Sequence, residues 1–161
     1  MEGSSDSSSV RVLALGNEFL ADDAFGPLVA AELRNRCGRT VDIVCSSASG
    51  LHLIDDVLGA ERLLVVDTVM TGSAAPGTIH VFDEQQARAP AGAAPHALGL
   101  FDALTLARSA GLPAPREVTI IAVEASDCTT LGGGIDVRVR DAVIRAAADV
   151  LSWIRQGGSH A

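Results

Sequence analysis

Short, continuously apolar runs constrain the fold of this chain more than any other feature. Runs at 10–15, 62–67 and 118–123 have the length and composition of strands that are buried on both faces of a sheet. Weaker runs at 41–45 and 78–82 complete the predicted sheet, the second as an edge strand or one arm of a hairpin whose direction the sequence does not fix.

Segments with apolar residues at helical spacing alternate with these runs. They lie at 27–37, 51–58, 97–110 and 135–154. Alternating strands and helices predict an α/β fold with three layers, α/β/α, around a mainly parallel twisted sheet of about five strands.

The 161 residues suffice for one domain, which we place at 10–156. Segments 1–9 and 157–161 are expected to be flexible tails, because the first is rich in Ser and the second begins with two Gly residues. Segment 1–9 lacks the basic and apolar regions of a signal peptide. No window approaches the roughly 18 uninterrupted apolar residues of a membrane span, so none is predicted.

Composition argues against several classes of protein. The formal net charge of −8 argues against binding to nucleic acid, which needs a basic surface. Three Cys residues without a C-x-x-C pair predict neither a disulfide framework nor a zinc knuckle, and they favour a cytoplasmic location. The first strand is not followed by G-x-G-x-x-G, which disfavours a dinucleotide site.

Acidic side chains gather where the predicted strands end. The loop after the first strand carries Asp22 and Asp23, and the run 62–67 ends in Asp67. The carboxyl ends of parallel strands meet at one edge of a sheet, where ligands are usually bound. We therefore expect Asp23 and Asp67 to lie at the same edge.

His96 is a third candidate, because it opens the helix 97–110 after a stretch rich in Ala, Pro and Gly. With Asp23 and Asp67 it would supply one nitrogen and two oxygen ligands to a metal. Each residue also has a simpler interpretation. Asp23 would cap the following helix, Asp67 would accept from loop amides and His96 would face water. The residues alone leave both interpretations open.

Other polar residues are weaker candidates for a site. Glu18 and Asp22 are expected to be solvated, although Asp22 has the alternative of bonding loop or helix amides. His52 and His80 have no acidic or thiol neighbour in their predicted elements, so we expect surface or packed histidines.

Four spaced motifs occur in order between Val12 and Val150. They are Gly16-Asn17 with Asp22-Asp23-Ala24-Phe25-Gly26, then Asp67 followed by Ala75-Pro76-Gly77-Thr78, then Pro95-His96-Ala97-Leu98-Gly99-Leu100-Phe101-Asp102-Ala103-Leu104, and last Val123-Glu124 with Thr129-Thr130-Leu131-Gly132. In this combination the chain resembles the endopeptidases that mature nickel-iron hydrogenases. The resemblance implies that Asp23, Asp67 and His96 bind the metal and act in catalysis.

The resemblance also implies an activity and a partner. The chain would be an endopeptidase that removes a carboxyl-terminal extension from a hydrogenase large-subunit precursor once nickel has been inserted. Nickel would be supplied by the precursor, and the protease would be a monomer. The ion would either polarise the scissile carbonyl or lower the pKa of a bound water, and the residues leave this choice open. The general base is not evident.

One segment departs from the family pattern. Where the family carries an Asp-Gly-Gly-Thr-like sequence after the second strand, this chain has Cys45-Ser46-Ser47-Ala48-Ser49-Gly50. Cys45 replaces an acidic residue, and we expect it to be a small buried hydrophobic residue, with a soft metal ligand or a redox-sensitive thiol as the alternatives. The departure leaves open an alternative function, a nickel-binding chaperone or inactive relative that binds the precursor without cleavage. The segment Leu15-Gly16-Asn17 also resembles peptidyl-tRNA hydrolases. The acidic net charge of the chain argues against that function.

Overall fold

One five-stranded sheet forms the centre of the molecule. The computed structural model describes residues 9–37, 41–88 and 95–157, and the side chains of 95–98 lie outside the described part. The strands are β1 (Val10–Leu15), β2 (Asp42–Ser46), β3 (Arg62–Val69), β4 (Ile79–Asp83) and β5 (Glu117–Glu124). Their order is β2-β1-β3-β5-β4. β4 runs antiparallel to β5 at one edge and the other pairs are parallel, which confirms the predicted sheet.

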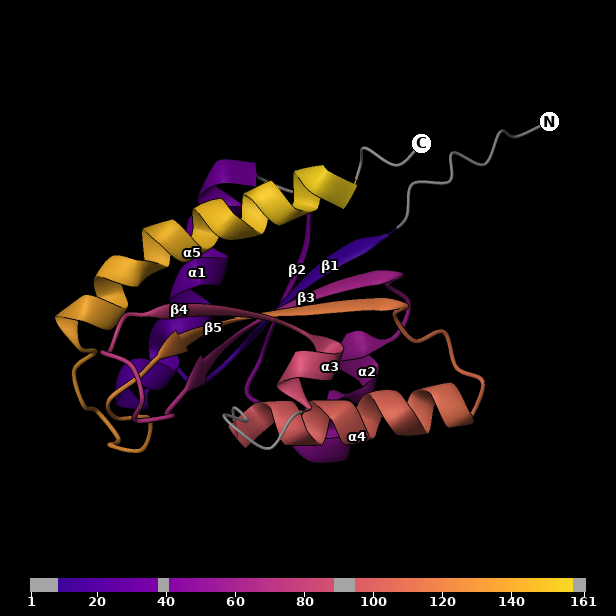
Figure 1. Cartoon of the computed structure of the whole chain (residues 1–161), viewed down its shortest axis with the longest axis horizontal. Coiled ribbons are helices and arrows are strands. Elements are labelled where there is room, and N and C mark those ends of the chain that lie inside the picture. Colours follow the sequence, from indigo (N-terminus) through magenta and orange to yellow (C-terminus); the bar gives the residue numbers. More distant parts are fainter. Residues whose placement is uncertain (1–8, 38–40, 89–94, 158–161) are drawn as a thin grey trace.

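Helices cover both faces of the sheet, so the three predicted layers are present (Figure 1). α1 (Phe25–Cys37) and α5 (Val137–Gln156) lie on one face. The other face carries α2 (Ile54–Val57), α3 (Glu84–Ala87) and α4 (Pro95–Ser109). Two 3-10 turns, η1 (Ala21–Ala24) and η2 (Gly50–Leu53), lead into α1 and α2.

The central strand β3 is apolar from Leu63 to Val66 because both of its faces are covered. Every residue from Leu63 to Val69 is buried. Successive side chains of a strand point to opposite faces, so Leu63 and Val65 pack in the core under α4, while Leu64 and Val66 pack in the core under α1 and α5. By the same alternation Asp67 belongs to the α4 side and Thr68 to the α1 and α5 side.

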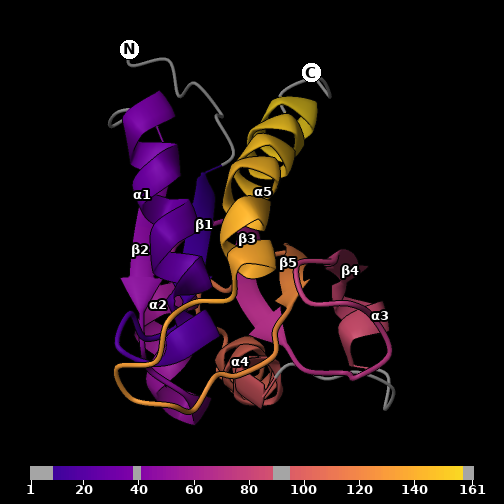
Figure 2. The same cartoon turned by 90° about the vertical axis from the view of Figure 1, so that its left-hand side faces the viewer.

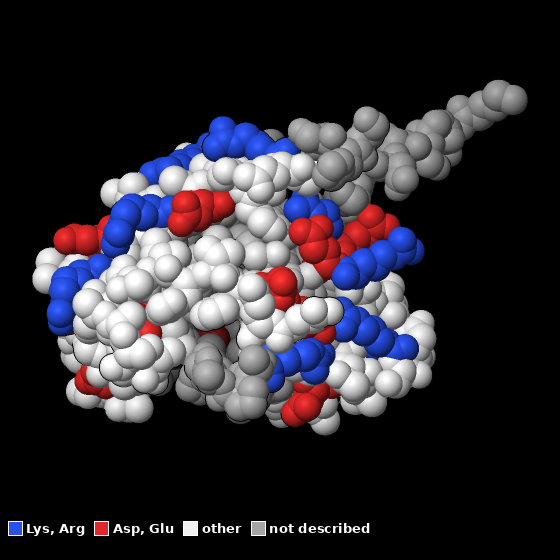
Figure 3. Space-filling view, viewed as in Figure 1, with Lys and Arg blue, Asp and Glu red and all other residues white. Residues whose placement is uncertain are grey.

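The long helix α5 is amphipathic, as its spacing predicts. Its buried residues, Val139, Ala142, Val143, Ala146, Ala147 and Val150, recur every three or four positions. Arg side chains lie along its outer surface, where they appear blue at the top of Figure 3. The helix begins after Asp136, whose carboxylate accepts a hydrogen bond from the backbone N–H of Arg138 and so caps its first turn.

The topology makes one edge of the sheet a natural site for a ligand. β1 lies between β2 and β3, and the connections that follow β1 and β3 lead to opposite sides of the sheet. Between such strands the connections diverge at the carboxyl ends and leave a crevice. Figure 2 looks onto this edge, where the orange segment that joins β5 to α5 crosses in front of the start of α1.

The structure leaves the predicted domain limits open. Apart from Ser9 and Gly157, the predicted tails 1–9 and 157–161 lie outside the described residues, and the limits 10–156 stay a prediction. Among the helices of the described ranges, none has the length and hydropathy that crossing a membrane requires.

Candidate functional site

Asp23 is buried in η1, just beyond the carboxyl end of β1, with 4% of its surface exposed. Its Oδ2 accepts a hydrogen bond from the backbone N–H of Asn17 at 2.8 Å. Its Oδ1 lies 3.4 Å from the hydroxyl of Thr68, which donates to it. The carboxylate is therefore directed toward β3 and the preceding loop, and it does not act as the helix cap of the simpler interpretation.

Asp67 lies near the end of β3 and is completely buried. Its Oδ1 accepts a hydrogen bond from the backbone N–H of Thr68 at 2.8 Å. Thr68 thus contacts both carboxylates, through its amide to Asp67 and through its hydroxyl to Asp23. The bond to Asp67 joins adjacent residues, so the hydroxyl of Thr68 is the contact that links Asp23 to the end of β3.

His96 is placed only by its backbone. It lies in the first turn of α4, which begins at Pro95, but its side chain lies outside the described residues. Among the side chains that the structure does describe, no group of three or more His, Cys, Asp or Glu residues is placed to hold a metal ion. The ligand set of Asp23, Asp67 and His96 therefore stays a prediction.

A pocket of about 230 Å³ opens beside Asp23 and Thr68. The residues that line this Asp23 pocket are Leu20, Asp23, Thr68, Val69, Met70, Cys128 and Thr129. The Cys128 thiol donates to the Thr68 hydroxyl at 3.5 Å. Burial, together with the nearby carboxylates of Asp23, Asp22 and Asp67, raises the pKa of the Cys128 thiol to about 11, although the hydrogen bond to Thr68 lowers it. Cys128 is therefore a neutral thiol at physiological pH.

Asp22 faces away from this pocket and is also buried, with 1% of its surface exposed. Its Oδ2 accepts from the N–H of Ser126 at 2.9 Å, the hydroxyl of Ser126 at 3.0 Å and the N–H of Asp127 at 3.1 Å. Its Oδ1 accepts from the N–H of Asp136 at 2.7 Å. We call Asp22, Ser126, Asp127 and Asp136 the Asp22 cluster. The expectation that Asp22 is solvated is wrong, and its alternative, bonding to loop and helix amides, is confirmed.

Glu124, the last residue of β5, anchors the loop after β3. Its buried carboxylate accepts from the N–H and hydroxyl of Thr71 and from the N–H of Gly72, and it lies 3.1 Å from Nε2 of His80. Burial raises the pKa of Glu124, but these hydrogen bonds lower it overall to below its usual 4.5. His80 is a partly buried histidine that stacks on Phe82, as expected, and antiparallel pairing of β4 with β5 gives it an acidic partner outside its own element.

Two glycines permit close backbone contacts that position the helices around this edge. A Cβ on Gly26 would lie 2.1 Å from the carbonyl oxygen of Leu15, so the first turn of α1 packs directly on the end of β1. A Cβ on Gly99 would lie 2.4 Å from the backbone nitrogen of Gly50, so the N-terminal part of α4 packs directly on η2. These contacts bring the starts of α1 and α4 to the edge that holds Asp23 and Asp67.

Cys45 is exposed, and the expectation that it is buried is wrong. Its sulfur accepts a hydrogen bond from Nη2 of Arg34 at 3.5 Å. It lines a separate open hollow of about 540 Å³ with the loop residues 16–19 and part of α1. Exposure follows from its position on β2, an edge strand that is covered less completely than β1 and β3.

Comparison with known proteins decides the family. The sequence model of the HycI family, described as hydrogenase maturation protease, matches residues 27–153. This chain belongs to the hydrogenase maturation protease family. The match spans most of the chain, so the family that the four motifs predicted is confirmed.

Relatives of this hydrogenase maturation protease match it over nearly its whole length. The Hydrogenase 2 maturation protease of Escherichia coli (strain K12) is 27% identical over 156 residues, which are 94% of each chain. The hydrogenase expression/formation protein HupM of Azotobacter chroococcum mcd 1 is 31% identical over 98% of this chain and 76% of HupM. The structure of the hydrogenase maturating endopeptidase HybD from E. coli matches with a TM-score of 0.78 and 25% identity, covering 93% of this chain and 94% of HybD. The predicted class of enzyme, a protease of hydrogenase maturation, is confirmed.

Proposed function

We propose that this protease removes a carboxyl-terminal extension from a nickel-loaded precursor of a hydrogenase large subunit. The observation that carries the proposal is that Asp23 and Asp67 are both buried at the carboxyl ends of the neighbouring parallel strands β1 and β3, where Asp23 lines a pocket. Carboxylate oxygens are suitable ligands for a divalent cation, and such an ion would offset part of the cost of burying the two acidic side chains.

The two carboxylates and His96 are the proposed ligands of the nickel ion, which arrives as part of the substrate. Oxygen and imidazole nitrogen are suitable donors for a divalent first-row metal. Once bound, the ion would polarise the scissile carbonyl or lower the pKa of a water molecule. Asn17 and Thr68 restrain the carboxylate of Asp23 before the substrate arrives, which reduces the ordering that binding requires. A precursor without nickel would lack these contacts, so metal loading would select the substrate.

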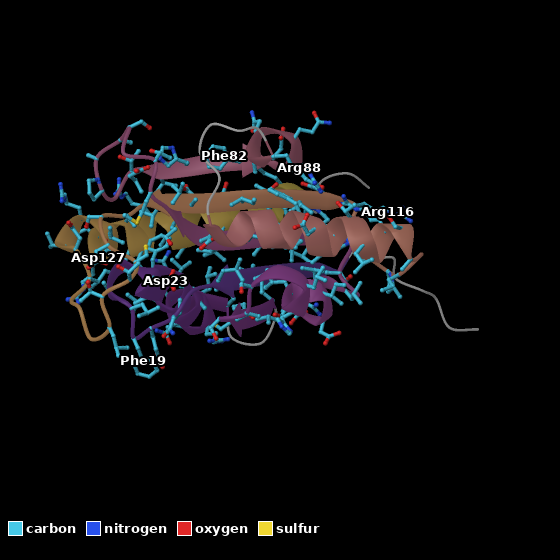
Figure 4. The ribbon with its side chains drawn as sticks, turned by 90° about the horizontal axis from the view of Figure 1, so that it is seen from below. Phe19, Asp23, Phe82, Arg88, Arg116 and Asp127 are labelled. Atoms are coloured by element: carbon cyan, nitrogen blue, oxygen red, sulfur yellow. The ribbon has the colours of Figure 1, made fainter. Side chains whose placement is uncertain are left out.

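Exposed apolar side chains beside the pocket support a protein substrate. Phe19 is 64% exposed, Leu131 is 77% exposed and Met70, which lines the pocket, is 52% exposed. Phe19 and Leu131 are held together because the N–H of Gly132 donates to the Phe19 carbonyl, and Leu20 pairs with Leu131. Figure 4 shows Phe19 projecting outward at the end of the molecule that contains Asp23. Exposed large apolar side chains on neighbouring segments are typical of protein-binding surfaces.

Intact-mass spectrometry of the precursor tests this proposal. We expect the wild-type protease to shorten the nickel-loaded precursor and to leave the nickel-free precursor unchanged. Asp67→Ala should leave both unchanged. If the wild type leaves the mass of the loaded precursor unchanged, the protease proposal is wrong. If the precursor then still co-elutes with the protein in gel filtration, the chaperone alternative is favoured. The same gel filtration, on the protease alone, tests the predicted monomer, and the cytoplasmic location stays a prediction.

A further inference from the structure

Asp22 and Asp23 are consecutive residues in η1 whose side chains act on opposite sides of the turn. Asp23 borders the pocket, whereas Asp22 accepts four hydrogen bonds from a segment that lies 104 to 114 positions later in the sequence. The contact is reciprocal, because the backbone N–H of Asp22 donates to the carbonyl of Asp127 at 2.8 Å. Figure 4 shows Asp23 and Asp127 at the same end of the molecule.

The turn that carries both carboxylates contains one unfavourable backbone conformation. Ala21 has a φ of +43°, in the left-handed region that side chains other than glycine avoid. Such a conformation persists only where surrounding contacts impose it. Those contacts come from segment 126–136, through the hydrogen bonds of Asp22 and through the bridge between Leu20 and Leu131.

Segment 126–136 also forms part of the pocket. Cys128 and Thr129, which line the pocket opposite η1, directly follow Ser126 and Asp127 of the Asp22 cluster. At its other end the segment leads into α5 through Asp136, whose N–H is held by Asp22. A single buried carboxylate therefore fixes both the turn that presents Asp23 and the opposite wall of the pocket.

We propose that Asp22 is a positioning residue for cleavage. It keeps Asp23 and the pocket wall formed by Cys128 and Thr129 in fixed positions relative to each other. The effect on cleavage rests on the function proposed above, while the structural effect does not. Asn is the sharpest substitution, because it keeps the shape but presents an NH₂ group on one side. Both carboxylate oxygens of Asp22 accept from N–H groups, so that NH₂ would face a donor.

The experiment compares Asp22→Asn with two matched variants of the full chain. Asp127→Asn changes a carboxylate in the same segment whose bonds to Thr129 and Thr130 stay within its own turn. Val143→Ala removes buried volume from α5, away from the pocket, and so lowers global stability alone. Amide hydrogen exchange is measured for peptides that cover 17–24 and 126–136, and cleavage kinetics are measured on nickel-loaded precursor at a temperature where every variant is folded.

We expect hydrogen exchange of both peptides to rise about tenfold in Asp22→Asn and to stay near the wild-type rate in Asp127→Asn. We expect kcat to fall about tenfold in Asp22→Asn while KM changes less than about threefold, because the lost contact orients Asp23 rather than docking the precursor. Val143→Ala should retain kcat. If Asp22→Asn does not fold, Ser126→Ala, which removes one of the four hydrogen bonds, should raise the same exchange to a smaller extent.

Wild-type exchange in both peptides of Asp22→Asn, or of Ser126→Ala where that variant replaces it, would overturn the proposal. An equal fall of kcat in Asp22→Asn and Val143→Ala would also overturn it, because the loss would then reflect stability alone. If the wild type cleaves no loaded precursor, the proposed function fails, and the hydrogen exchange comparison by itself decides whether Asp22 holds the two segments together.

Discussion

Asp22 and Asp23 are both buried at the same edge of the sheet, yet their surroundings differ. Asp22 accepts three backbone N–H groups and one hydroxyl, which together occupy both of its oxygens. Asp23 accepts one N–H and one longer hydrogen bond from a hydroxyl, and it borders a pocket. The number of fixed donors thus separates a carboxylate that holds the fold together from one that keeps acceptor capacity for a ligand.

Glu124 extends this comparison, because it resembles Asp22 and not Asp23. Its oxygens accept two backbone N–H groups and a hydroxyl, all from the loop after β3, and they also face His80. Asp22 and Glu124 therefore stabilise loops, whereas Asp23 and Asp67 are the pair that we assign to binding of the substrate. Substitutions at these and neighbouring positions test this division, and we begin with the one for which we expect the greatest loss.

The largest effect is expected for Asp67→Asn. The substitution preserves volume but removes a negative charge from a completely buried position, so we expect the cleavage rate to fall at least about 100-fold. Glu18→Gln, in the exposed part of the first loop, is the matched control and should retain the wild-type rate. Initial rates from intact-mass spectrometry check both variants. A loss of less than tenfold in Asp67→Asn would remove Asp67 from the site.

The next largest effect is expected on the stability of the fold and not on catalysis. Asp22→Asn leaves a buried donor without an acceptor, so the free energy of unfolding should fall by about 2 kcal/mol. Asp127→Asn changes a carboxylate whose hydrogen bonds from Thr130 and Thr129 stay within its own turn, so the free energy of unfolding should stay close to the wild-type value. Urea unfolding at neutral pH measures both, and equal losses would contradict the division.

Gly99→Ala should have a somewhat smaller effect. The added Cβ would meet the backbone of Gly50 at 2.4 Å, so α4 must move away from η2 at a cost of about 1–2 kcal/mol. Gly134→Ala is a suitable control, because a Cβ there has nothing within 4 Å. Thermal unfolding distinguishes the two variants, and an unchanged melting temperature in Gly99→Ala would show that this contact does not constrain the helix that carries His96.

The smallest effect is a dependence on pH. The pKa of Glu124 is lower in the folded protein than its usual 4.5, so its contribution to stability is present above that value and is lost as the pH falls. Glu124→Gln lacks this contribution. We expect the melting temperature of the wild type to exceed that of Glu124→Gln at neutral pH, and the difference to shrink below about pH 4.5. A constant difference at every pH would contradict the assigned hydrogen bonds.

Much of the fold could be predicted from the sequence, because apolar periodicity reports burial directly. The continuous run of β3 and the spacing of α5 both specify which faces are covered. The antiparallel direction of β4 could not be predicted, because the alternation of apolar and polar residues is the same in a parallel and in an antiparallel strand.

Less of the candidate site than of the fold could be predicted from the sequence. Asp23 and Asp67 could be placed together because both follow neighbouring parallel strands. The role of Asp22 could not be predicted, because its partners lie more than 100 positions away and are mostly backbone amides, which leave no signature in side-chain identity. The pairing of His80 with Glu124 was missed for a related reason, since it depends on the direction of β4.

The most direct test of the division between the two neighbouring carboxylates is the initial rate of cleavage of nickel-loaded precursor by Asp23→Asn and Asp22→Asn, measured side by side by intact-mass spectrometry. We predict that Asp23→Asn loses at least about 100-fold in rate and that Asp22→Asn loses about tenfold. Cleavage by Asp23→Asn at the rate of the wild type, or a greater loss in Asp22→Asn than in Asp23→Asn, would contradict the assignment of Asp23 to the substrate.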